Sequence, residues 1–158
     1  MATPTYTALA TTTLSSATAS VTFGSIPSTY RDLIIVVQGT TTLNNEIPIL
    51  SINGDTTSAN YNRVVMYGDG SSTGSAASST RSMASFGTSP AMWIGQLMDY
   101  SATDKHKTLL YRNDKSNEIV VAGAFRWANT AAVTSVTIEA TSNTFTAGST
   151  FSLFGIEA

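Results

Sequence analysis

Hydrophobic and polar residues alternate along most of this chain with the period of two that is typical of β-strands. The pattern is clearest in segment 17–23, where apolar side chains occupy every second position: Ala17, Ala19, Val21 and Phe23. Small polar residues fill the positions between them. This alternation predicts an antiparallel strand with one face buried and one face exposed.

The segment 33–37 is a continuous apolar run, rich in the β-branched residues that fit a pleated sheet. It is too short for an ordinary helix, and Gly39 and the polar stretch after it end the run. We therefore predict a central strand that is buried on both faces. Pro27 begins the turn that leads into it, and Arg31 and Asp32 are expected to stay solvated.

Further apolar or alternating segments lie between turn signals and predict additional strands at residues 6–14, 47–52, 61–67, 81–86, 91–100, 107–112, 118–127, 133–140 and 150–156. Roughly ten strands without a helix indicate an all-β chain. We predict a single antiparallel β-sandwich of jelly-roll type that spans residues 1–158. Residues 1–16 are expected to form an extended edge strand or an arm between subunits.

Two polar segments predict connections. Asn53-Gly54 is a strong turn signal, although the residues up to Tyr61 are polar and favour a longer connection than a two-residue hairpin. Residues 68–80 consist almost entirely of Gly, Ser, Thr and Ala, which cannot form a core. We predict a mobile loop there, or a loop that is ordered by a neighbouring subunit.

Charged residues make up only 11% of the chain, and the formal net charge is −2. No basic stripe is present, so we expect no nucleic-acid partner. The chain has no cysteine, which removes disulfides and thiolate metal sites. No apolar run is long enough to span a membrane, and Met1-Ala2-Thr3-Pro4 lacks the features of a signal peptide. We expect synthesis in a cytoplasm and no membrane partner.

Reactive side chains are sparse. The single histidine, His106, lies between Lys105 and Lys107 at a predicted turn, where a solvated side chain is the expected state. A serine triad would have to use His106, which is the only histidine of the chain. We therefore predict no enzyme activity, no catalytic residue, no cofactor and no metal. Spacing along the sequence does not test whether two carboxylates face each other across a cleft, so glycan cleavage stays a distant alternative.

Four aromatic residues are candidates for a surface that stacks on sugars or contacts a partner: Trp93, Trp127, Tyr67 and Tyr61. At strand spacing, aromatic side chains more often belong to the core and its rim, and we favour that interpretation. A sugar-binding platform is the second hypothesis, because exposed aromatic rings beside Ser, Thr and Asn suit glycan binding.

Several phrases resemble a family of small β-rich virion proteins of tailed bacteriophages. The matching stretches cover nearly the whole chain in order: Ala19–Leu33 with its Ile26-Pro27-Ser28-Thr29-Tyr30-Arg31-Asp32-Leu33 phrase, Ser51-Ile52-Asn53-Gly54-Asp55 followed by Asn60-Tyr61, Trp127–Val136 and Gly148–Ile156. The family usually has Tyr where this chain has Phe154. These motifs describe turns and strands, and the family has no catalytic residues to carry over.

The resemblance implies a non-enzymatic virion protein that is made in the host cytoplasm. Since the chain has no long shaft, we expect a capsid decoration (cement) protein that stabilises the particle exterior as a homotrimer or other closed oligomer. Its partners would be further copies of itself and the major capsid protein. The alternative is a tail-fibre or receptor-binding module that recognises host surface glycans. The candidate inter-subunit residues are Thr11, Thr12, Thr13, Ser71 and Ser72.

Overall fold

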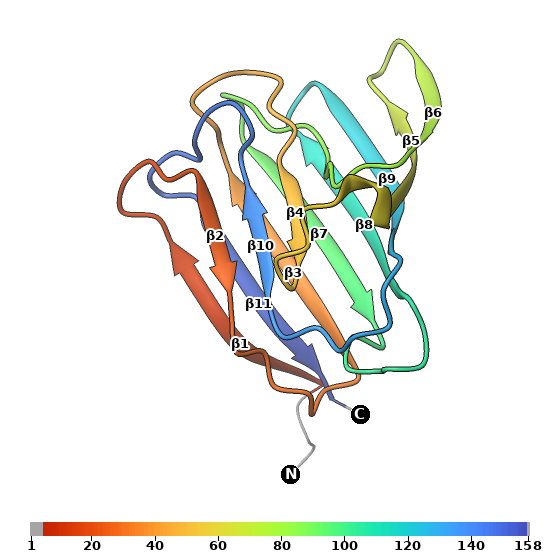
Figure 1. Cartoon of the computed structure of the whole chain (residues 1–158). Helices are drawn as coiled ribbons and strands as arrows, with labels where there is room; N and C mark the ends of the chain where they lie inside the picture. The colour runs from red at the N-terminus through yellow and green to blue at the C-terminus, as the bar shows by residue number, and fades with distance from the viewer. Residues whose placement is uncertain (1–4, 158) are drawn as a thin grey trace.

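The computed structural model describes residues 5–157, most of which belong to antiparallel β-strands (Figure 1). Within these residues the chain forms eleven strands and one short 3-10 helix: β1 (Tyr6–Thr13), β2 (Ser20–Phe23), β3 (Asp32–Gly39), β4 (Ile49–Ile52), η1 (Ser58–Asn60), β5 (Tyr61–Gly68), β6 (Thr73–Ser78), β7 (Ala91–Met98), β8 (Lys107–Lys115), β9 (Ile119–Trp127), β10 (Val136–Glu139) and β11 (Thr150–Ile156). The predicted all-β class is confirmed. No helix in the described chain is long and apolar enough to cross a membrane.

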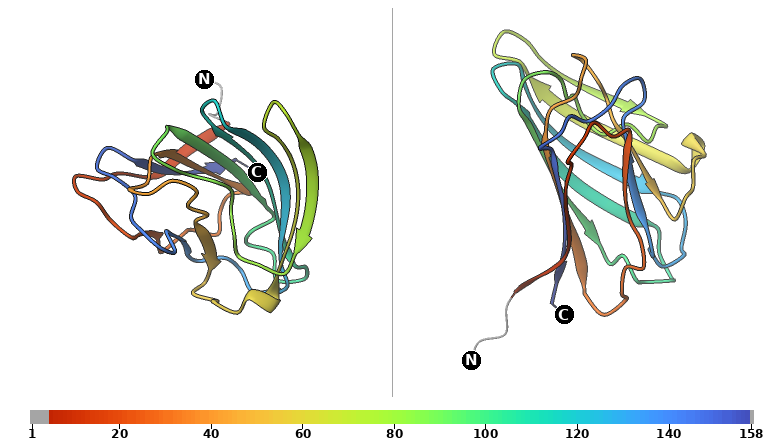
Figure 2. Two further views of the ribbon diagram at one scale, coloured as in Figure 1. Left: turned by 90° about the horizontal axis from the view of Figure 1, so that it is seen from above. Right: turned by 90° about the vertical axis from the view of Figure 1, so that its left-hand side faces the viewer.

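The strands form two sheets that pack face to face as a β-sandwich (Figure 2). The large sheet has eight strands in the order β1-β11-β3-β7-β8-β9-β5-β6, and the small sheet has three in the order β2-β10-β4. The first four strands alternate between the two sheets, so distant segments become neighbours. A jelly roll is built from eight strands in two Greek keys. The division into eight and three strands does not confirm the predicted jelly roll.

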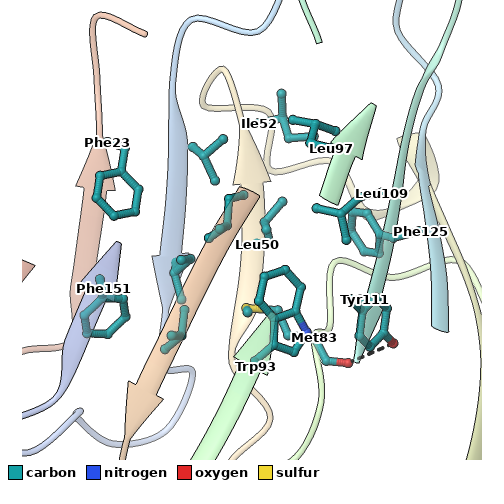
Figure 3. Close-up of a cluster of buried hydrophobic side chains, with 14 of the residues drawn as sticks. Phe23, Leu50, Ile52, Met83, Trp93, Leu97, Leu109, Tyr111, Phe125 and Phe151 are labelled. Atoms are coloured by element: carbon teal, nitrogen blue, oxygen red, sulfur yellow. Dashed lines mark hydrogen bonds between the residues drawn. The ribbon is translucent and has the colours of Figure 1, made fainter. Parts of the chain in front are cut away.

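The core lies between the small sheet and one face of the large sheet, here called the inner face (Figure 3). On β3, the side chains of Leu33, Ile35 and Val37 point to the inner face and are completely buried. Ile34 and Val36 point the opposite way and are only partly buried. The prediction that this strand is buried on both faces is therefore correct for the inner face alone, because nothing in the described chain covers the other.

Asp32, which was expected to stay solvated, is only 5% exposed. Its carboxylate accepts hydrogen bonds from Gln96 Nε2 at 2.8 Å and from the backbone N–H of Asp99 at 3.0 Å. The exposed Arg31 guanidinium pairs with the same carboxylate at 3.3 Å. These hydrogen bonds and the ion pair replace the water that the Asp32 carboxylate loses on burial, so the charged group can be buried at this position.

The predicted loop at residues 68–80 is wrong, because it contains the edge strand β6. Residues of β6 pair with β5 from Arg63↔Ser78 to Gly68↔Thr73. The hairpin turn is held by Asp69, whose carboxylate accepts hydrogen bonds from the backbone and hydroxyl groups of Ser71 and Ser72. These hydrogen bonds hold the pKa of Asp69 well below its ordinary value. A sequence of small polar residues can thus form an edge strand through backbone pairing alone.

Two other predicted strands differ from the observed ones. Residues 81–86 form no strand and make only single bridges, from Ser82 to Ile49 and from Phe86 to Glu46. Strand β2 is shorter than the predicted segment 17–23, and the predicted apolar face is buried at Val21 and Phe23 but exposed at Ala17 and Ala19. In both segments the backbone makes isolated hydrogen bonds, such as Met83 N–H to Pro48 O and Thr18 N–H to Phe145 O, in place of a continuous ladder, which alternation along the sequence does not reveal.

Glycines in the middle of strands make room for aromatic rings on the inner face. Tyr111 and Gly123 are direct cross-strand neighbours, and a Cβ atom at Gly123 would clash with the Tyr111 ring. Gly95 accommodates the ring of Trp93 in the same way. The rings of Trp93 and Tyr111 stack with their centroids 5.5 Å apart. The two glycines therefore determine where the two large side chains lie.

We expect Gly123→Ala to lower the free energy of unfolding by about 1–3 kcal/mol, because the added methyl group overpacks the site under the Tyr111 ring. Gly24→Ala is the matched control: a Cβ atom there meets nothing within 4 Å. It should change stability by no more than about 0.5 kcal/mol. Urea denaturation of both variants measures the difference, and equal midpoints would contradict the packing argument.

Candidate functional site

The face of the large sheet that points away from the small sheet, here called the outer face, is the most unusual surface of the molecule. Its residues alternate with the buried ones along each strand, and the strand register aligns them into rows. One row runs across five strands through Val36, Ile94, Arg112, Ala122 and Met66. No other described segment packs over this face, so its side chains meet solvent.

The outer face is rich in exposed apolar side chains. Among the nine large hydrophobic residues that are exposed in the described chain, six lie here: Tyr6, Val64, Met66, Met92, Leu110 and Val120. Met66 and Val120 are 64% and 61% exposed. Single exposed apolar residues are common on soluble proteins, but a contiguous group of this kind marks an interaction surface.

A shallow hollow of about 350 Å³ lies on the β3–β7–β8 part of the outer face. Its wall includes Tyr6, Ile34, Ile94, Leu110 and Arg112. The hollow is open, and its wall mixes these apolar side chains with the polar groups of Gln96 and Arg112.

Two oppositely charged side chains of β8 lie on the outer face, one inside the strand and one at its end beside the β8–β9 turn. Arg112 and Asp114 occupy alternate positions of β8, and both are exposed. Arg112 has Ile94 and Ala122 as its cross-strand neighbours, and Asp114 has Met92 and Val120. Neither charged group belongs to one of the three ion pairs found among residues 5–157.

The favoured interpretation of the four aromatic candidates as core residues is confirmed for three of them, so the alternative of a sugar-binding platform does not hold for those three. Trp93, Trp127 and Tyr61 are 1%, 2% and 0% exposed. Tyr67 alone reaches the surface, and its ring lies against Gly74 of the neighbouring strand. The three buried rings cannot contact a glycan in this fold, because the small sheet and the adjacent loops cover the inner face to which they point.

Two of these buried aromatics anchor the turn between β4 and β5. Asn53 and Gly54 both have positive φ, and the N–H of Asp55 donates to Ile52 O at 2.9 Å, which confirms the predicted turn. The Asp55 carboxylate accepts hydrogen bonds of 2.8 Å from Trp127 Nε1 and from Asn60 Nδ2. The hydrogen bond from the Trp127 indole contributes most to holding the pKa of Asp55 below its ordinary value of 3.8.

Tyr61 completes this network. Its hydroxyl donates to the carbonyl oxygen of Asp55 at 2.9 Å and accepts a hydrogen bond from the N–H of Ile52 at 3.0 Å. Burial raises the pKa of Tyr61 to about 12. The phrase from Asn53 to Tyr61, which contributes to the resemblance to phage virion proteins, therefore has a structural role in this chain.

The predicted inter-subunit residues lie at opposite borders of the large sheet. Thr11, Thr12 and Thr13 are exposed on β1, which pairs only with β11 and is an edge strand as predicted. Residues 6–13 of the expected arm thus belong to the sheet as β1, and residues 1–4 lie outside the described residues. Ser71 and Ser72 are exposed at the tip of the β5–β6 hairpin. Their contact with other subunits stays a prediction.

The candidate side chains for catalysis and metal binding do not form a reactive cluster. His106 is exposed in the turn before β8, as predicted. Among residues 5–157, no group of three or more His, Cys, Asp or Glu side chains is placed to hold a metal ion. The buried Lys107 ammonium instead donates to three backbone carbonyl groups, at Ala102, Lys105 and Thr130. Desolvation lowers the pKa of Lys107.

No family model matches this chain, and no curated protein matches it. Among solved structures, alginate lyase Aly36B is similar with a TM-score of 0.37 and 8% identity, over 92% of this chain and 77% of the lyase. A variant of the same lyase in complex with alginate tetrasaccharide has a TM-score of 0.35 and 10% identity, over 94% and 79%. A Shewanella oneidensis MR-1 protein of unknown function has a TM-score of 0.26 and 11% identity, over 100% and 78%.

These TM-scores are too low to transfer the fold or the activity of those proteins to this chain. The resemblance to phage virion proteins stays a prediction. Sequence reasoning did not predict an exposed apolar outer face, although a continuous apolar run in the sequence could have indicated it. A continuous apolar run such as residues 33–37 is typical of a strand that is buried on both faces. One of those faces can be buried by another molecule.

Leu109 and Leu110 are neighbours on β8 that point to opposite faces, and they test whether the outer face is uncovered. Leu109 is 1% exposed and Leu110 is 48% exposed. In dilute solution we expect Leu109→Ala to cost about 2–5 kcal/mol of unfolding free energy, and Leu110→Ala about 0.5 kcal/mol or less. Chemical denaturation measures both, and similar losses would mean that the outer face is covered within one chain.

Asp55→Asn tests the turn network. The change places an NH₂ group against a donor, so we expect a loss of about 1–3 kcal/mol at neutral pH. Because the folded-state pKa of Asp55 is lowered, its stabilising effect is present above the unfolded-state pKa and is lost as the pH falls through the folded-state pKa.

The difference between Asp55→Asn and the unchanged protein should therefore shrink in acid, as measured by denaturation midpoints between neutral pH and about pH 2. Asp104→Asn, at an exposed turn position, is the control and should change little. A difference that does not depend on pH would contradict the assignment to the Asp55 carboxylate.

Proposed function

We propose that this protein is a non-enzymatic structural component of a bacteriophage virion, and that it decorates the capsid exterior. The observation that carries the proposal is the apolar outer face of the large sheet. Apolar side chains that are exposed to water cost free energy, and this face exposes Val64, Met66, Leu110 and Val120. A partner that covers these side chains removes that cost. Association is therefore the activity that the geometry supports best.

The edge strands support the same function. β1 and β6 end the large sheet on either side, and each leaves one row of backbone groups without a strand partner in the described chain. Such edges accept a strand or a loop from another protein. A decoration protein needs this combination, because it stabilises a particle by adding buried interface across joints between capsid subunits.

The sequence phrases that resemble virion proteins of tailed phages support the proposal that the assembly forms on a phage particle. A tail-fibre or receptor-binding module is the alternative within the same class. It has less support, because three of the four aromatic candidates, Trp93, Trp127 and Tyr61, are core residues. The partners we propose are further copies of the chain and the major capsid protein.

Immunogold labelling of intact particles with antibody against this chain tests the proposal. We expect gold over the capsid surface, and we expect particles that lack the protein to burst at lower temperature or after milder osmotic shock. Gold confined to the tail would overturn the decoration role and favour host binding. Particles without any label, from cells that express the protein, would contradict the virion assignment.

A further inference from the structure

We propose that Lys115 and Asn44 form an isopeptide bond within one chain, and that the Glu118 carboxylate moves the protons of this reaction. The bond joins the end of β8 to the loop between β3 and β4. The inference goes beyond the proposed function and does not depend on it, because the reaction needs no partner and no external substrate.

The first observation is the surroundings of the Lys115 amine. Lys115 is the last residue of β8, and it is 1% exposed. Its Nζ is one of the buried polar atoms of residues 5–157 that make no hydrogen bond. The other buried lysine, Lys107, donates instead to three backbone carbonyl groups. Desolvated lysine amines serve as nucleophiles in proteins, and the amine of Lys115 is not occupied by hydrogen bonds.

The second observation is a proton acceptor beside this amine. Lys115 Nζ forms an ion pair with the Glu118 carboxylate across the β8–β9 turn. The turn is closed by a hydrogen bond of 3.0 Å from Glu118 N–H to Lys115 O, and Asn117 in the turn has a positive φ. The Glu118 side chain is 36% exposed, so it also exchanges protons with water. A nucleophile within reach of a base is the arrangement that covalent chemistry requires.

The third observation is an amide close to the same amine. Gly87 has no side chain, and a Cβ atom there would overlap Asn44 Oδ1 and would lie 3.0 Å from Lys115 Nζ. Both atoms thus lie within 3.0 Å of one point, and they are no more than twice that distance apart. Asn44 is exposed, so rotation of its side chain and of the long lysine stem brings the amine to the amide carbon.

Two backbone hydrogen bonds hold the segments that carry these groups together. The N–H of Thr41 donates to Gly87 O at 2.7 Å, which ties the β3–β4 loop to the segment before β7. The N–H of Ser116 donates to Pro90 O at 3.0 Å, which ties that segment to the end of β8. The fold therefore places the amide and the amine side by side before any bond forms, which is the condition for an efficient reaction within a chain.

The reaction balances without a further reagent. Glu118 takes a proton from the Lys115 ammonium group, and the neutral Nζ attacks Cγ of Asn44. The protonated Glu118 gives this proton to the amide nitrogen of Asn44, the C–N bond breaks, and ammonia leaves. Glu118 then takes the surplus proton from the new amide nitrogen and passes it to water. The products are one secondary amide and one ammonia, and no atom changes its oxidation state.

Such a bond gives the chain a covalent link that it has no other means to form. The sequence has no cysteine, so disulfides are absent. A link between residues 44 and 115 closes a long loop and restricts the unfolded chain, as a disulfide does. An amide is not broken by reductants.

Intact-mass spectrometry of the denatured, purified full-length protein tests the inference. We expect the unchanged chain to be lighter than its sequence by the mass of one ammonia. Lys115→Arg and Asn44→Ala should keep their full sequence mass, because each lacks one reacting group. Glu118→Gln should form the bond at least about a hundredfold more slowly, because the amide accepts no proton from the amine. Lys105→Arg, at an exposed lysine, is the matched control and should still lose ammonia.

Asn44→Asp provides a second test that a structural role of Asn44 does not satisfy. Aspartate at this position forms the same amide by losing water in place of ammonia. The linked variant and the linked unchanged chain are then the same molecule, so their masses should be equal. Because Asn44 is exposed, its two variants are expected to fold even if Lys115→Arg does not.

Tandem mass spectrometry after trypsin digestion locates the bond. Arginines precede residue 32 and residue 113 and end the peptides at residues 63 and 126. We expect one branched peptide that joins residues 32–63 to residues 113–126, without cleavage after Lys115.

Three results would overturn the inference. The first is an unchanged chain of full sequence mass. The second is a loss of ammonia that persists in Lys115→Arg, because an asparagine that cyclises onto the next backbone nitrogen, as at Asn53-Gly54, loses the same mass. The third is a link from Lys115 to Asn113 inside the single peptide 113–126, which would assign the amine to a different amide.

Discussion

Burial of the inner face of the large sheet against the small sheet is the contact on which the rest of the structure depends. The strands β2, β4 and β10 are only four residues long, so backbone pairing alone does not hold the small sheet. Val21, Leu50 and Ile138 secure it by packing onto the large sheet. The short strands thus exist because the large sheet offers an apolar face on which they pack.

The small sheet has three strands and covers only part of an eight-stranded neighbour. Large aromatic rings and the segment around Met83 fill the remaining inner face, and glycines such as Gly123 give those rings the space to lie flat. This requirement explains why Trp93 and Tyr61 belong to the core. It also explains why the residues around Asp55 form a hydrogen-bonded cap, since a buried indole N–H needs an acceptor.

The arrangement of the two sheets also leaves exposed the surface that we propose for assembly. A sandwich buries one face of each sheet, so the outer face of the large sheet has no cover of its own, yet it carries Val64, Leu110 and Val120. Apolar residues at such positions have no benefit for a solitary chain and favour association.

The sequence by itself determined the fold class, most strands and the turn at Asn53-Gly54, because alternation and positive-φ residues act locally. It did not predict β6, which depends on pairing with β5, or the burial of Asp32, which depends on Gln96. Only the tertiary structure decided which aromatic rings are buried and which apolar face stays open. Local sequence sets which side chains share a face of a strand, whereas the packing of distant strands decides which of the two faces is covered.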